Sequence, residues 1–361
     1  MTHRVFNFNP GPSTLPLDVL QTVREELLDY RGTGMSVLEI SHRSPEYDAI
    51  NAEAMALLKE LMGLGDEYKI LFVGGGASTQ FALIPMNFLR GGQVGAYVDT
   101  GTWSTKAMQE AQIQGNTVLA ASSKEAGYTY VPKQEDLEIP DNSAYLHITT
   151  NNTIKGTQYH YVPEAGGVPL IADMSSDICS RRMDFSRFAM IYAGAQKNLG
   201  PSGVTVVVIR DDLLERCLDV LPTMLNYQTH AAKQSLYNTP PCFAVYIVKL
   251  VLERIKHGGG LEAVAKVNEK KKDTIYALID QDPDYFRGTA REDSRSWMNV
   301  TLRLPSEDLE KKFIAEAKKR GLVGLKGHRS VGGIRISLYN AMTLEGAEKV
   351  AAFMQAFRKA N

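Results

Sequence analysis

The sequence predicts an α/β protein whose central sheet is mainly parallel and covered by helices on both faces. Three observations support this fold class. Short apolar runs alternate with helix-forming stretches between residues 69 and 209. The runs are apolar and rich in β-branched residues, as expected of strands buried on both faces. Charged or polar residues follow several of the runs, at the carboxyl edge where such sheets bind ligands.

The elements can be placed in order along the chain. Strands of one seven-stranded sheet are expected over 69–73, 94–98, 117–121, 144–148, 169–172, 190–192 and 204–209. Helices are expected over 17–28, 45–63, 78–89 and 103–115. Ser44 is the expected N-cap of the second helix, since Pro45 suits the first helical position. Residues 6–16 are rich in Pro and Gly, which predicts an ordered loop without regular structure.

The pattern changes at His257-Gly-Gly-Gly260. Helices are expected on both sides of it, over 242–256 and 261–281, followed by strands over 298–304 and 333–338 and helices over 306–320 and 344–358. This arrangement is typical of a small α+β domain. We therefore expect a large cofactor-binding domain over 17–257, and a small domain over 258–361 that also includes residues 1–16.

Composition excludes several classes of protein. The chain has 361 residues, 44% of them hydrophobic, and a formal net charge of −1. A near-neutral chain without long basic runs is not expected to bind nucleic acid. Three cysteines without metal-ligand spacing predict neither a disulfide framework nor a metal site. Without a signal-like N-terminus or a run of 18 apolar residues, we expect a cytoplasmic protein that makes no membrane contact.

Two of the predicted strands end beside charged residues. One is followed by Asp173 and the next by Gln196-Lys197. A partly desolvated lysine at a sheet edge can lose its proton and form a Schiff base with an aldehyde. A nearby carboxylate keeps a pyridine nitrogen protonated. Together they are the protein's contribution to pyridoxal-phosphate chemistry, although two surface charges could give the same pattern.

Residues 74–80 read Gly-Gly-Gly-Ala-Ser-Thr-Gln, between a predicted strand and a predicted helix. Glycines let the backbone approach an anion, and a helix N-terminus offers free N–H groups. The segment is neither a Walker loop nor a Rossmann fingerprint. It predicts a phosphate cup, and the Asp173/Lys197 pair strengthens that interpretation because it indicates a phosphorylated cofactor.

Other residues at strand ends could complete such a site. Trp103 could stack on a planar ring, and the hydroxyl of Thr153 could bond the ring's oxygen, although core packing and a capped turn would also explain them. Cations occur in Ser41-His-Arg-Ser44 and in 326–335, which includes His328, Arg329 and Arg335. Guanidinium groups bind carboxylate and phosphate. A solvated basic face is the alternative, but the glycines around His328-Arg329 argue against it.

These motifs resemble the phosphoserine aminotransferases, a family in the class V branch of the fold-type I pyridoxal-phosphate aminotransferases. The matching stretches are Phe6-Asn-Phe-Asn-Pro-Gly-Pro, Ser41-His-Arg-Ser, Gly74-Gly-Gly-Ala-Ser-Thr-Gln, Asp173-Met-Ser-Ser, Gly194-Ala-Gln-Lys-Asn-Leu-Gly-Pro-Ser-Gly, Tyr237-Asn-Thr-Pro-Pro and Gly332-Gly-Ile-Arg-Ile-Ser-Leu-Tyr-Asn-Ala. They extend from one end of the chain to the other.

The resemblance implies a role for each candidate residue. Lys197 would hold one pyridoxal 5'-phosphate per subunit as a Schiff base, and Asp173 would pair with its pyridine nitrogen. Trp103 would stack on the ring, and Thr153 would contact its oxygen. The cofactor phosphate would be bound by Ala77, Ser78 and Gln196, with Asn238 and Thr239 of a second subunit. Arg335 would bind the substrate α-carboxylate; the distal anion would be bound by Arg43, His328 and Arg329, with His42 as a further substrate contact.

The activity that the resemblance implies is reversible transamination. L-Glutamate and 3-phosphohydroxypyruvate would give 2-oxoglutarate and O-phospho-L-serine, a step of serine biosynthesis, and a related phosphorylated substrate of pyridoxine synthesis would also fit. The enzyme would be a homodimer whose subunits share their active sites.

Three alternatives fit the residues less well. A cysteine desulfurase needs a nucleophilic cysteine on a loop near the substrate, and Cys179, Cys217 and Cys242 do not occupy such a position in the sequence. An alanine–glyoxylate type transaminase has no use for a second cationic cluster. A cofactor-sensing regulator would need an attached DNA-binding module, for which the chain has no spare segment.

Overall fold

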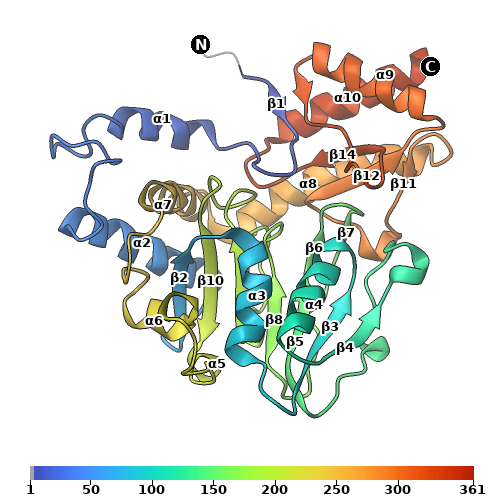
Figure 1. The fold of residues 1–361 in the computed structure, drawn as a ribbon. Coiled ribbons are helices and arrows are strands. Elements are labelled where there is room, and N and C mark those ends of the chain that lie inside the picture. Colours follow the sequence, from blue (N-terminus) through green and yellow to red (C-terminus); the bar gives the residue numbers. More distant parts are fainter. Residues whose placement is uncertain (1–3) are drawn as a thin grey trace.

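A seven-stranded sheet lies at the centre of the part of the chain described by the computed structural model, residues 4–361 (Figure 1). Its strands are β2 (Tyr68–Val73), β3 (Val94–Asp99), β4 (Thr117–Ser122), β5 (Ser143–Thr149), β8 (Leu170–Asp173), β9 (Met190–Gly194) and β10 (Thr205–Arg210). All seven strands predicted from the sequence are confirmed, with ends that differ by at most two residues.

The strands lie in the order β2-β10-β9-β8-β5-β3-β4. Strands β9, β8, β5, β3 and β4 are parallel neighbours, whereas β10 is antiparallel to both β2 and β9. The predicted, mainly parallel sheet is therefore confirmed. Its parallel strands end at one common edge, which is the edge where ligands bind in open α/β sheets.

Successive side chains along the strands enter two different cores. Phe72 and Val206 belong to one buried cluster, while their neighbours Leu71 and Val207 belong to another. Helices α2 (Pro45–Met62) and α7 (Cys242–His257) contribute to the first cluster, and α3 (Gly76–Phe88) and α4 (Thr102–Gln114) to the second. Because both faces are covered, the strands carry apolar residues at consecutive positions.

The remaining helices of this part of the chain are α1 (Leu17–Glu26), α5 (Asp211–Leu214) and α6 (Tyr227–Ala232). The predicted start of α2 is confirmed, with Ser44 as N-cap and Pro45 first in the helix, although the Ser44 hydroxyl bonds none of the helix's N–H groups. The sequence did not reveal α6, because a six-residue helix is too short to show a helical period.

A second layer of structure follows α7 and has its own apolar cluster (Figure 1). Its elements are β11 (Arg287–Gly288), β12 (Asn299–Arg303), β13 (Leu322–Val323), β14 (Ile334–Ser337), α8 (Gly260–Gln281), α9 (Glu307–Lys319) and α10 (Leu344–Ala360). β12 pairs antiparallel with both β11 and β14. The strand–helix–strand–helix pattern read from the sequence is confirmed, whereas the domain boundary at 257/258 stays a prediction.

The N-terminal segment joins this second layer. Strand β1 (Phe6–Asn7) pairs in parallel with β13, and Phe8 is fully buried in the same apolar cluster. The prediction that residues 6–16 lack regular structure is therefore wrong at Phe6–Asn7. Pairing with the distant strand β13 stabilises these two residues, and the local composition from which the prediction was made gives no information about such pairing. None of the helices described between residues 4 and 361 is long and apolar enough to cross a membrane.

Candidate active site

A cavity of about 370 Å³ lies at the carboxyl edge of the seven-stranded sheet, between this sheet with its helices and the loop before β14. It brings together residues from α3, α4, the ends of β5 and β8, the turn after β9, and β14. Nine of the residues predicted for the site line it: Ala77, Ser78, Trp103, Thr153, Asp173, Gln196, Lys197, His328 and Arg335. Their positions in the sequence range over 259 residues, from 77 to 335.

The glycine-rich turn forms one end of the cavity. β2 ends at Val73 and α3 begins at Gly76, so two residues make the turn. Gly75 and Gly76 have φ angles of +90° and +70°, which side chains disfavour. A Cβ on Gly75 would also lie 2.1 Å from the Thr79 hydroxyl. Among the described residues no side chain caps α3, so its first N–H groups are available to an anion.

Asp173 and Lys197 come from the carboxyl ends of two neighbouring strands, β8 and β9. Asp173 is the last residue of β8, is 5% exposed, and accepts a bond from the Ser175 N–H at 2.9 Å. Burial raises the pKa of Asp173, while the Lys197 ammonium opposes that shift. Burial lowers the pKa of Lys197, and Arg335 lowers it further, whereas Asp173 raises it. A lysine with a lowered pKa is a better nucleophile toward an aldehyde.

Trp103 and Thr153 form a wall of the cavity. The Lys197 ammonium lies 5.9 Å from the centre of the Trp103 indole, and the indole Nε1 donates to Thr153 Oγ1 at 3.2 Å. This bond fixes the indole beside the lysine. Thr153 follows the short strand β6 (Asn151–Asn152), which pairs with β7 (Thr157–Gln158) in a hairpin that the sequence did not reveal.

Arg335 is a buried cation that also lines the cavity. It lies on β14, is 6% exposed, and donates from Nη1 to the Thr153 carbonyl at 3.1 Å. Its Nε is buried and bonds no atom of the described residues. Burial lowers its pKa. A buried guanidinium in this state is suited to bind an anionic ligand.

The other predicted residues do not line this cavity. Arg329 is exposed next to the half-buried His328. Asn238 and Thr239 are exposed in the loop between α6 and α7. His42 and Arg43 lie in the loop before α2, and neither is among the lining residues. One chain therefore brings nine of the predicted residues to the cavity, and its segments 41–44 and 237–241 contribute none of the lining.

Sequence reasoning missed the contribution of the N-terminal segment. Pro10 and Gly11 line the cavity, and a Cβ on Gly11 would lie 3.4 Å from Lys197 Cγ. The Ser13 hydroxyl donates to the Lys197 carbonyl at 2.6 Å, and the Tyr339 hydroxyl donates to the Pro10 carbonyl at 2.7 Å. The Pro-Gly-Pro motif was the available signal, since glycine allows such a close approach to the lysine.

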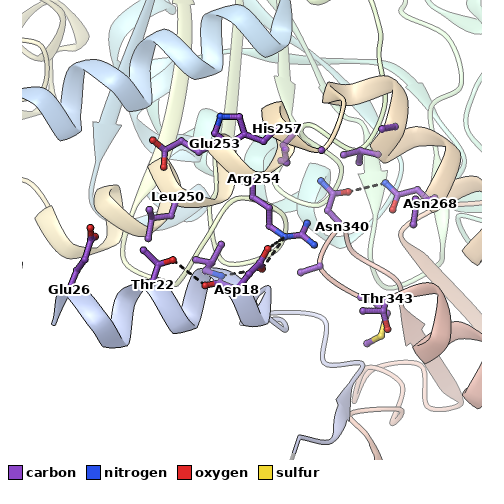
Figure 2. Close-up of a pocket in the computed structure, with 18 of the residues that line it drawn as sticks. Asp18, Thr22, Glu26, Leu250, Glu253, Arg254, His257, Asn268, Asn340 and Thr343 are labelled. Atoms are coloured by element: carbon purple, nitrogen blue, oxygen red, sulfur yellow. Dashed lines mark hydrogen bonds and ion pairs between the residues drawn. The ribbon is translucent and has the colours of Figure 1, made fainter. Parts of the chain in front are cut away.

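A larger groove of about 830 Å³ lies between α1, α7, α8 and the loop before α10. Figure 2 shows its charged side chains, and Arg254 lies against Asp18 with two hydrogen bonds of 3.0 and 2.8 Å. The other charges of the groove are also paired, Arg31 with Glu26 and Glu253 with Lys249, and none of the predicted site residues lines it. The smaller cavity is therefore the candidate active site, because its polar groups are buried and convergent.

The residues of that cavity fit pyridoxal phosphate. The uncapped start of α3 suits a phosphate, the buried Asp173 carboxylate suits a protonated ring nitrogen, and the Trp103 indole offers a flat wall. Lys197 is close enough to that wall to reach an aldehyde on a ring stacked against it. Arg335 remains available for a substrate anion.

Comparison with known proteins identifies the family and the fold. Residues 5–350 match the model of the family described as aminotransferase class-V. The chain is 57% identical to a phosphoserine aminotransferase of Desulfatibacillum aliphaticivorans over the full length of both. Its fold matches a solved phosphoserine aminotransferase from Bacillus circulans subsp. alkalophilus with a TM-score of 0.98, at 52% identity and 99% coverage of each chain. A pyridoxal-phosphate-bound phosphoserine aminotransferase from Trichomonas vaginalis matches with a TM-score of 0.92, at 35% identity, over 98% of this chain and 100% of that one.

Proposed function

The chain belongs to the class V aminotransferases, and we propose that it transfers the amino group of L-glutamate to 3-phosphohydroxypyruvate, giving 2-oxoglutarate and O-phospho-L-serine. The observation that supports this best is a cavity that places an arginine and a histidine beside Lys197. Arg335 is buried with an unsatisfied Nε, and His328 lines the same cavity from the loop before β14. Both substrates have an α-carboxylate and a second anion.

Pyridoxal 5'-phosphate, one per subunit, is the proposed cofactor, attached covalently to Lys197. When bound, it supplies an electron sink for the charge that develops at the substrate α-carbon. Ala77, Ser78 and Gln196 would hold its phosphate, and Asp173 would keep its ring nitrogen protonated.

Lys197 would also move the proton. Once the substrate amine has replaced it, its Nζ is free to remove the proton at the substrate α-carbon and return it on the cofactor side. Burial lowers its pKa, so a larger fraction of it is neutral and able to act as a base near neutral pH. The Ser13–Lys197 and Trp103–Thr153 bonds restrict the lysine backbone and the facing wall.

The substrate would be held at both ends. Arg335 would bind the α-carboxylate, and the distal phosphate or carboxylate would be bound by His328, Arg329 and Arg43, with His42 beside them. Because no residue of segments 41–44 and 237–241 lines the cavity of their own chain, we propose that a second copy supplies them. The active unit would then be a homodimer, with Asn238 and Thr239 on the neighbouring cofactor phosphate.

Features of the structure argue against the two enzymatic alternatives. A cysteine desulfurase needs a reactive thiolate near the substrate, but burial raises the pKa of Cys179 to about 12 and that of Cys217 to about 11. Neither these cysteines nor Cys242 lines the cavity. An alanine–glyoxylate type enzyme does not need a group that binds an anion at the distal end of the substrate, which is the role proposed for His328.

A phosphorylated hydroxythreonine of pyridoxine synthesis is a further proposed substrate, because it also has an α-carboxylate and a distal phosphate.

The test combines a spectrum with a choice of acceptors. The purified holoenzyme is expected to be yellow, and L-glutamate should remove its visible band. With glutamate as donor, 3-phosphohydroxypyruvate should be a better acceptor than glyoxylate by at least about tenfold, since a charge-assisted bond contributes roughly 1.5–3 kcal/mol. Lys197→Ala should fold yet fail to retain cofactor after borohydride reduction. Equal use of both acceptors, or turnover by Lys197→Ala, would contradict the proposal.

A further inference from the structure

The loop before β14 is closed by its own backbone. The Gly327 N–H donates to the Gly333 carbonyl at 2.8 Å, and the N–H groups of Val331 and Gly332 both donate to the His328 carbonyl. A Cβ on Gly327 would lie 1.9 Å from the Gly332 carbonyl oxygen, so a side chain there would force the loop open. The loop that contains His328 and Arg329 is therefore a compact turn whose two ends meet.

A buried carboxylate on α9 holds one end of this turn. Glu310 is 5% exposed, and its Oε2 accepts the Gly333 N–H at 3.2 Å. Its Oε1 accepts Arg303 Nε at 2.5 Å and the Leu304 N–H at 3.2 Å. Both carboxylate oxygens are thus used, as a buried anion requires. Gly333 lies two residues before Arg335, so this contact is close in sequence to the α-carboxylate site.

Arg303 holds the other side of the turn. Its Nη1 donates to the Val331 carbonyl at 3.0 Å, while its Nε is bonded to Glu310. The hydrogen bond to Glu310 raises the pKa of Arg303, which keeps the guanidinium charged. Arg303 and Glu310 together form a bracket, which we call the Arg303–Glu310 bracket, and it reaches the loop backbone at Val331 and Gly333.

The bracket lies next to the active-site cavity. A smaller cavity of about 130 Å³ is lined by Arg303, His328 and Arg335, and His328 and Arg335 also line the active-site cavity. The bracket does not touch the active-site cavity itself. The bracket bonds the backbone at Val331 and Gly333, which lie in the sequence between His328 and Arg335.

The bracket is not needed to join α9 to the sheet beside it. Phe313 and Ala317 of α9 are fully buried in the same apolar cluster as Val300 and Leu302 of β12. Apolar burial already supplies that packing. The Gly333 and Val331 bonds go instead to the loop backbone, where they fix the position of His328.

We propose that Glu310 and Arg303 are positioning residues that set the separation of His328 from Arg335, and thereby the preference for substrates with a distal anion. This inference rests on the proposed function. A loop released from the bracket would still leave Arg335 on β14, paired with β12 over Asn299–Leu302. Binding of the α-carboxylate should therefore survive, while binding of the distal anion should weaken.

The test uses Glu310→Gln with Glu307→Gln as its matched control. Both glutamates are on α9, but Glu307 is 78% exposed and 3.9 Å from Arg303, so its loss should matter little. In Glu310→Gln, an NH2 donor would replace one of the two carboxylate oxygens that now accept hydrogen bonds, so one side of the bracket would lose its acceptor. In the holoenzyme without substrate, Glu310→Gln should speed hydrogen exchange over 326–333. It should also lower kcat/KM for 3-phosphohydroxypyruvate by about tenfold and for hydroxypyruvate by less than about threefold.

Arg303→Lys provides a second variant, since its partly exposed side chain keeps the charge but loses the Val331 bond. It should show the same pattern in weaker form. Unchanged exchange over 326–333 in both variants would overturn the positioning role. Faster exchange with equal losses for both acids would overturn the specificity role. If the wild-type holoenzyme does not prefer the phosphorylated acid, the proposed function and the specificity role fail together, whereas the exchange result still decides the positioning role.

Discussion

The buried wall of the active-site cavity and the loop segments 41–44 and 237–241 differ in one respect: a single chain completes the wall but does not bring these segments to the cavity. On the wall, Asp173 and Arg335 are each at most 6% exposed, and each is fixed by a hydrogen bond to a neighbouring strand or turn. In the loop segments, the side chains of Arg43, Asn238 and Thr239 are exposed and do not line the cavity. The residues of the wall reach their positions when one chain folds. The residues of the loop segments need contact with a ligand or with another chain to gain a fixed position.

This difference follows from how each region is built. Residues at the ends of parallel strands converge because the strands end at one edge, so the fold itself positions them. Exposed loops have no such constraint, and their polar groups gain a fixed geometry only by contact with a ligand or another chain. Two-fold homodimers are the commonest assembly that would supply this contact reciprocally.

The largest expected effect on kcat/KM comes from removing Arg335 of the wall, and its dependence on the substrate should differ from that of removing the exposed Arg329. Arg335→Ala should lower kcat/KM by at least about a hundredfold for every substrate, because each one presents an α-carboxylate to a buried guanidinium. Arg329→Ala should cost about tenfold to a hundredfold for 3-phosphohydroxypyruvate but far less for hydroxypyruvate. Steady-state kinetics with the two acids measures both. If Arg329→Ala slowed the two acids by one common factor, the exposed cations would have only a structural role.

A smaller effect concerns pH. Burial lowers the pKa of His328, and Arg335 and Arg329 lower it further, below the usual 6.5, so the free enzyme holds it neutral near pH 7. A distal anion favours the charged imidazole. Binding therefore takes up a proton, and affinity for a distal anion should rise as the pH falls.

The measurement is the ratio of kcat/KM for glutamate to that for norvaline, which has no distal charge. The ratio cancels the titration of Lys197, which both amino acids share. It should rise a few-fold as the pH falls from about 7 to about 5.5. In His328→Asn the ratio should stay flat over that range. A flat ratio in the wild type would show that His328 does not bind the distal anion.

The sequence predicted the elements and residues that follow from local pattern. Apolar runs located the seven strands, and the residues after them located Asp173, Lys197 and Trp103 at one edge. The cavity contributions of Pro10 and Gly11 were not predicted, because they depend on β1 pairing with β13, more than 300 residues away. Contact of two distant segments leaves no periodicity in either of them.

The Arg303–Glu310 bracket was missed for a related reason. The charges of Arg303 and Glu310 look in the sequence like those of any solvated helix and strand end. Only the three-dimensional structure shows that Glu310 is buried and that its donors belong to the turn before β14. Composition does not show which charged residues are buried, and it is burial that distinguishes Glu310 from a solvated surface charge.

The shared active site is the central claim, and hybrid dimers test it most directly. One subunit would bear Lys197→Ala, and the other Arg43→Ala together with Asn238→Ala and Thr239→Ala; different affinity tags allow the hybrid to be purified. If a second copy completes each cavity, the hybrid has one intact site of two and should show about half the wild-type kcat per dimer, while both parent dimers are nearly inactive. If each chain completes its own cavity, the hybrid contains no intact site and should be as inactive as its parents, which would contradict the account.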